Sequence, residues 1–121
     1  MATSNLIKYD VPTSEMDLSN FPSQYIPRIT FYRQLNTVVC VYAFVTKTFT
    51  NTADHTIISQ DKIPIDFRPT DNDIYRNIIS YMGTVRHGLL RVNTNGSMQV
   101  RMGTSNTSMN VYGSIEYIVE D

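Results

Sequence analysis

Two histidines are the residues of this 121-residue chain most suited to acid–base or metal chemistry. His55 follows Asp54 in a polar stretch, and His87 follows Arg86 just before a hairpin pattern. A catalytic dyad or a metal pair built on them would need a nucleophile or a third ligand, and no spacing in the sequence supplies one. We therefore interpret both histidines as exposed loop residues, with ligand contact as the alternative, and expect no catalytic residue.

The sequence gives equally little support for metal binding or redox chemistry. Cys40 is the sole cysteine, so neither an internal disulfide nor a multi-cysteine zinc site can form, and its place in an apolar run indicates a buried thiol. Asp71 and Asp73 flank Asn72 as at the start of a calcium loop, but the glycine and glutamate further along such a loop are missing. The sequence predicts a turn there, with no metal and no cofactor.

The composition limits the kinds of partner that the chain is expected to bind. Ten basic and eleven acidic residues give a formal net charge of -1, which is too small a field to favour nucleic acid. No run approaches the ~20 apolar residues of a membrane span, and no secretion signal is visible, so we expect a soluble domain without membrane insertion. Only 17% of residues are charged. A surface of neutral hydrogen-bonding groups suits proteins that bind neutral polar ligands.

The elements that must position these residues are organised around Asn36–Val45, where apolar residues occupy both alternating sets of positions. One side of a strand here would carry Val39 and Val41, and the other Val38 and Cys40. No long crossover helix is in sight to cover a parallel sheet. We therefore expect a second sheet on one face, and a loop or a neighbouring subunit on the other.

The segments before and after this run predict extended structure. Residues 1–27 contain three prolines among polar residues and are interpreted as an arm or linker, whereas Arg28–Gln34 alternates as a half-buried strand does. A short strand is expected over 56–59. Ile63–Pro69 is interpreted as an extended crossing segment at a sheet edge, with Phe67 inserted into the core.

Two readings compete for residues 72–82. The apolar residues match helical spacing, yet β-branched and aromatic residues favour a strand, which we prefer. Leu89–Met102 predicts a hairpin. A three-residue loop, Thr94 to Gly96, opposes apolar residues to one another, whereas a two-residue turn would mix polar and apolar groups on one face.

The last strand alternates cleanly from Val111 to Val119. Six or seven short strands joined by polar turns predict an all-β domain over 28–121, an antiparallel β-sandwich or jelly roll.

Four stretches, taken in order, resemble the C-terminal receptor-binding head domain of tail or baseplate proteins from phages of Gram-positive bacteria. They are Y-R-Q-L-N-T-V-V, I-P-I-D-F-R-P, G-L-L-R-V-N-T-N-G-S-M-Q-V and V-Y-G-S-I-E-Y-I-V, and they lie within residues 28–121. The resemblance implies a homotrimer in the virion, at the tail tip or baseplate. It implies contacts with other tail or baseplate proteins, and non-enzymatic attachment to a host cell-surface saccharide. Related heads often stack tryptophan on sugar, and this chain has no tryptophan.

A saccharide site needs polar side chains that satisfy pairs of hydroxyls and an apolar ring face. The loop residues that offer these groups are Asp54, His55, Tyr75, Arg76, Tyr81, Arg86 and His87. Two other functions stay open: a structural virion component without receptor binding, and a cell-wall hydrolase, for which no paired carboxylates are visible.

Overall fold

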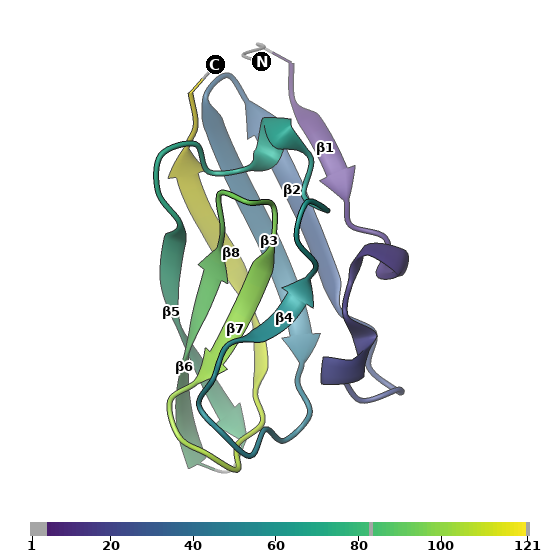
Figure 1. Ribbon diagram of the computed structural model, residues 1–121, viewed down its shortest axis with the longest axis vertical. Coiled ribbons are helices and arrows are strands. Elements are labelled where there is room, and N and C mark those ends of the chain that lie inside the picture. Colours follow the sequence, from purple (N-terminus) through teal and green to yellow (C-terminus); the bar gives the residue numbers. More distant parts are fainter. Residues whose placement is uncertain (1–4, 83, 121) are drawn as a thin grey trace.

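The computed structural model describes residues 5–82 and 84–120, with the side chains of residues 81, 82 and 84 outside that description. Within these residues the chain forms two antiparallel four-stranded sheets (Figure 1). Sheet A has the order β1 (Ile7–Asp10), β2 (Arg28–Gln34), β3 (Thr37–Val45) and β8 (Asn110–Ile118). Sheet B has the order β4 (His55–Ile58), β7 (Met98–Met102), β6 (Thr84–Val92) and β5 (Ile74–Met82). The all-β prediction is confirmed, and the arrangement is β-sandwich-like.

The hydrophobic core lies between the sheets and draws on both. In β3 the residues Val38, Cys40, Tyr42 and Phe44 are buried, as one face of a strand should be. Leu90, Val92, Met98 and Val100 supply the matching face of the β6–β7 hairpin. Strict two-residue alternation therefore explains which half of each strand the core contains.

Several local predictions are confirmed. Residues 74–82 form a strand, not a helix. The hairpin pairs Leu90 with Val100 and Val92 with Met98, and Gly96 has a φ of 82°, the left-handed conformation that the three-residue loop requires. Cys40 is fully buried, and burial raises the pKa of its thiol.

The N-terminal segment differs from the expected arm. β1 pairs with β2, and Val11, Met16 and Phe21 lie in the core. Two 3-10 turns, Thr13–Glu15 and Leu18–Asn20, connect these anchors. The scattered apolar residues of this segment are thus separate contacts with one domain, and β1 brings the described strands to eight instead of the expected six or seven.

The crossing segment is partly as expected. Phe67 is buried, but it ends a 3-10 turn, Ile65–Phe67, where extended structure was predicted. The buried Arg33 donates to the carbonyl oxygens of Leu35 (2.8 Å) and Asp66 (2.7 Å), and the Tyr117 hydroxyl donates to the Phe67 carbonyl oxygen (2.5 Å). These bonds tie the turn to sheet A, since buried backbone carbonyls require donors.

The outer face of β3 has no cover from the described part of the chain. Val41 is 44% exposed and Val39 is half-buried, although neighbouring positions on the inner face are buried. The described residues therefore leave this face without the second cover that the two-sided apolar run predicts.

Candidate functional site

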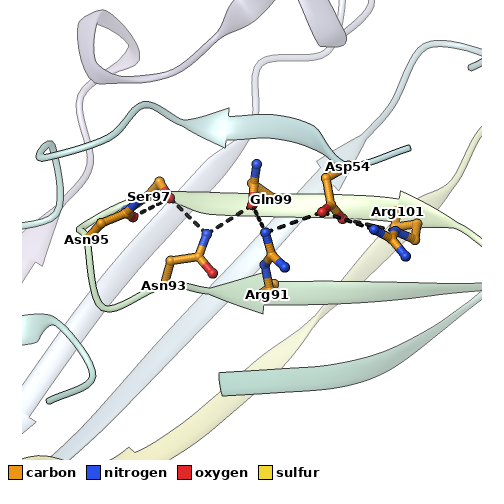
Figure 2. Close-up of polar contacts among 7 residues, drawn as sticks. All are labelled: Asp54, Arg91, Asn93, Asn95, Ser97, Gln99 and Arg101. Carbon is orange, nitrogen blue, oxygen red and sulfur yellow. Dashed lines mark hydrogen bonds and ion pairs between the residues drawn. The ribbon is translucent and has the colours of Figure 1, made fainter. Parts of the chain in front are cut away.

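A chain of polar side chains crosses the outer face of sheet B along β6 and β7 (Figure 2). Because the apolar residues of the hairpin point into the core, the alternate positions carry polar side chains on the opposite face. They are Arg91 on β6 and the buried Asn93 just after its end. On the partner strand they are Gln99 and Arg101. The hairpin therefore presents an ordered polar surface on the side away from the core.

Asp54 anchors one end of this chain between two arginines. Arg101 donates to both carboxylate oxygens of Asp54, from Nε and from Nη2, at 3.1 Å each. Arg91 Nη2 lies 3.3 Å from Asp54 Oδ2. Planar, two-point contacts of this kind fix the orientation of the guanidinium group as well as its charge.

Amides and a hydroxyl continue the chain toward the hairpin loop. Gln99 Oε1 accepts from Arg91 Nη2 and from Asn93 Nδ2. Asn93 Nδ2 also donates to Ser97 Oγ (2.8 Å), and the Ser97 hydroxyl donates to Asn95 Oδ1 (2.6 Å). Each side chain is thereby held by its neighbours before any ligand arrives.

The hairpin loop is clamped by the segment before β5. Asp61 N donates to the Asn95 carbonyl oxygen and Ile63 N to that of Gly96, both at 3.0 Å. The Arg68 guanidinium lies against Gly96, so a Cβ added there would come within 2.6 Å of Arg68 Nε. On the other side, Thr94 N donates to Asp73 Oδ1 (2.9 Å). The loop is thus positioned by backbone and side-chain contacts with the segments before β5.

A pocket of about 350 Å³ opens over this network. It is lined by Thr56, Gln60, Asp73, Arg91, Asn93, Thr94, Asn95, Ser97 and Gln99. Ligand pockets of this size are usually lined by apolar side chains with a few polar groups. A lining made of hydroxyl, amide and paired charged groups suits a ligand that is itself rich in hydroxyls.

Two atoms of the network have no hydrogen-bond partner among the described residues. They are Asn93 Oδ1, an acceptor, and Arg91 Nε, a donor, and both are buried at the atomic level. Asn93 as a whole is only 5% exposed, and Figure 2 shows its oxygen pointing away from Ser97 and Gln99. A buried polar atom without a partner costs about 1–3 kcal/mol. A ligand hydroxyl can donate to the first atom, and a ligand oxygen can accept from the second, once the side chains that cover these atoms move aside.

Tyr75 adds an aromatic surface beside the pocket. It lies across from Arg91 in the β5–β6 pairing, and the Arg91 guanidinium carbon is 5.8 Å from the centre of its ring. The residue is 54% exposed. A ring held in place by a cation and still open to solvent can pack against the C–H face of a sugar.

The predicted site residues are only partly brought together. Asp54 and Tyr75 both contact Arg91. His55 is half-buried where exposure was expected, because its ring stacks on Phe49 with centroids 3.6 Å apart. Its Nε2 lies 3.1 Å from Asn51 Oδ1.

The remaining predicted residues are located elsewhere. Arg76 lines a separate groove between β5 and β8. Arg86 donates to the carbonyl oxygen (3.0 Å) and the hydroxyl (3.1 Å) of Ser108. His87 is exposed, as expected, but it lies in strand β6 where a loop was expected. The side chain of Tyr81 lies outside the described residues. None of the three described residues lines the pocket.

Sequence reasoning missed Arg91, Asn93, Ser97 and Gln99. The alternation that identified Leu90 and Val92 as core residues also places their neighbours on the opposite face, and apart from Leu89 those neighbours are polar. The polar residues of this alternating pattern were the signal that could have identified the network.

Within residues 5–82 and 84–120 we find no group of three potential metal-binding side chains. No helix in this part of the chain is long and apolar enough to cross a membrane. Comparison with known protein families finds no family model that matches the chain, and no curated protein matches it either.

Proposed function

We propose that the chain is a non-enzymatic attachment module that binds a neutral saccharide in the pocket on sheet B. The observation that carries the proposal is the pair of partnerless atoms, Asn93 Oδ1 and Arg91 Nε, in a network whose other groups hold them in place. A saccharide presents hydroxyls that both donate and accept, so it satisfies an acceptor and a donor together.

The charges around the pocket favour a neutral ligand over an anionic one. Arg91 and Arg101 share the carboxylate of Asp54, and Asp73 adds a second negative charge to the lining. Two cations and two anions leave no net field to attract a charged sugar. Recognition then depends on hydrogen bonds and on the Tyr75 ring.

The lining also favours binding over hydrolysis. Glycosidases place two carboxyl groups on either side of the bond they cleave. Among the described residues that line the pocket, Asp73 is the single carboxylate, and its Oδ1 already accepts from Thr94 N.

The resemblance to phage head domains supplies a setting for this module. In that setting three copies assemble at the tip of a tail or baseplate, next to other tail proteins, and attach the virion to the host surface. The uncovered outer face of sheet A around Val39 and Val41 supports self-association. Many copies on one particle turn weak binding at each site into firm attachment.

The test is a matched pair of arginine substitutions, assayed for binding to cell walls purified from Gram-positive bacteria. Arg91→Lys keeps a positive charge near Asp54 but removes the partnerless Nε donor. Arg101→Lys makes the same change to the same ion-pair partner outside the pocket. We expect roughly tenfold weaker binding for the first variant, the worth of one charge-assisted hydrogen bond, and little change for the second.

If both variants bind the cell walls equally well, the pocket is not the binding site. No binding by the unsubstituted chain to any wall preparation would favour the alternative, a structural virion component. The exposed apolar positions on sheet A support that alternative independently of the pocket.

A further inference from the structure

The four edge strands of the two sheets differ in length and in protection. β1 and β4 have four residues each, and the pairing of β4 is interrupted by a register shift. β5 and β8 have nine residues each. Short or irregular edges resist pairing with other chains, whereas long regular edges invite it. The long edge β8 is therefore a candidate for pairing with another strand.

The hydrogen-bond pattern shows which backbone groups of β8 face outward. Val119 N donates to the Asn36 carbonyl oxygen, and Thr46 N donates to that of Met109. Because hydrogen-bonded pairs alternate in an antiparallel ladder, the odd-numbered residues of β8 bond to β3. The backbone groups of the even-numbered residues then face away from the sheet: Tyr112, Ser114, Glu116 and Ile118.

Side chains hydrogen-bond to this edge at both ends, and between them residues 112–114 face β5 across an open groove. Asn110 N donates to Ser80 Oγ (2.9 Å), and Glu120 N donates to Thr70 Oγ1 (3.1 Å). Between them, the outward backbone groups of residues 112–118 make no hydrogen bond to any described residue. The segment contains neither lysine nor proline, two devices that block an edge, and Glu116 is its single charged residue.

The side chains of the same even-numbered residues lie on the outer face of sheet A, and they are apolar at both ends of the segment. Tyr112 is 85% exposed and Ile118 is 70% exposed, with Ser114 and Glu116 between them. The segment is complementary to a second copy of itself that runs in the opposite direction. A reversed copy centred on Ile115 opposes each Tyr112 to an Ile118 and each Ser114 to a Glu116.

We propose that β8 pairs antiparallel with β8 of a second copy across a twofold axis at Ile115, which joins two A sheets into one. This register brings together two aromatic–β-branched pairs and two serine–carboxylate pairs, both favourable across strands. A shift of one pair in one direction places Glu116 opposite its own copy. The same shift in the other direction separates Tyr112 from Ile118 and requires Asn110 N, which Ser80 already satisfies.

This contact is independent of the saccharide pocket and of the proposed threefold contact. The pocket lies on sheet B, and a threefold contact would use the outer face of β3, whereas this one uses the backbone edge of β8. The twofold contact alone gives a dimer. Together with a trimer it gives six chains with dihedral symmetry, a common closed arrangement.

The first test is Ser114→Pro, with the native mass measured by light scattering after size exclusion. Proline removes an outward N–H that the single chain does not use, and edge strands accept it. Ser114→Ala is the matched control. We expect an even number of chains for the unsubstituted protein and for Ser114→Ala, and half that number for Ser114→Pro. A mass of one or three chains at every concentration, or one unchanged by a folded Ser114→Pro variant, would overturn the proposal.

A second test reads the register through two exposed side chains, so that it survives a proline variant that fails to fold. Tyr112→Lys and Ile118→Glu, made singly, should each weaken the dimer at least tenfold. Combined in one chain they place lysine opposite glutamate twice and should restore most of that loss. Additive weakening in the double variant would contradict the register, and no effect of either single change would contradict the contact.

Discussion

The outer faces of the two sheets differ in the polarity of their side chains, although the strands of both sheets alternate in the same way toward the core. On sheet B the outward residues Arg91, Asn93 and Gln99 form one connected polar network. On sheet A the outward residues of β3 include Val39 and Val41, which nothing in the described chain covers. The first face is built to hold polar groups in place, and the second is left with apolar area to bury.

We propose that this difference gives the two faces separate tasks. A network whose members hold one another in place needs only small side-chain movements to bind a polar ligand, which lowers the entropy cost of binding. An exposed apolar strand gains free energy only when another surface removes it from water. In the proposed function, sheet B binds the ligand and sheet A takes part in assembly.

The largest expected effect is on the free energy of unfolding, and it compares the inner and outer faces of β3. Phe44→Ala should lower the free energy of unfolding by about 3–5 kcal/mol, because the buried ring packs against Phe21 and Tyr42 and its loss leaves a cavity. Val41→Ala, on the outer face of the same strand, should cost less than about 1 kcal/mol in the monomer. Denaturant unfolding measures both, and similar losses would mean that the two faces of β3 are not distinct.

A smaller effect is expected in the sheet B network. Asn93→Ala removes the donor to Ser97 Oγ and Gln99 Oε1, so it should cost about 1–2 kcal/mol and weaken saccharide binding. Asn77→Ala, an exposed position on β5, should change stability by less than about 0.5 kcal/mol. If the two variants unfold at the same denaturant concentration, the network does not hold the pocket.

The smallest effect concerns the inner face at alkaline pH. Burial raises the pKa of the Cys40 thiol and of the Tyr117 hydroxyl, so the folded chain keeps protons that the unfolded chain releases. Their contribution is complete below the ordinary thiol pKa of about 8.5 and declines as the pH rises further. We expect a loss on the order of 1 kcal/mol by about pH 9.5. Cys40→Ala should remove most of this dependence, and a flat profile for the unsubstituted chain would contradict it.

The sequence predicted the parts of the fold that depend on local pattern. Alternating residues identified β2, β3 and β8, and Gly96 with its apolar flanks set the hairpin register, because both features are encoded by neighbours in the chain. β1 escaped prediction because only Ile7 and Tyr9 pack against the core, and its pairing with β2 is a tertiary contact.

The candidate site was predicted only in outline. Asp54 and Tyr75 were identified, but the residue that joins them, Arg91, was not. Asp54 meets Arg101 across 47 positions of sequence, a separation that no local pattern encodes. Arg91 and Asn93 were visible as the polar half of a strand pattern, but their role depends on the pocket that β4 and the loop before β5 complete.

The most direct test of the central claim is a side-chain NMR titration with a saccharide released from Gram-positive cell walls that the chain binds. Arg91 Nε–H and the Asn93 amide protons report on the two atoms that should meet the ligand. We expect their resonances to shift during the titration while those of Val39 and Val41 on sheet A stay fixed. Shifts confined to sheet A, with Arg91 and Asn93 unchanged, would contradict the assignment of ligand binding to sheet B.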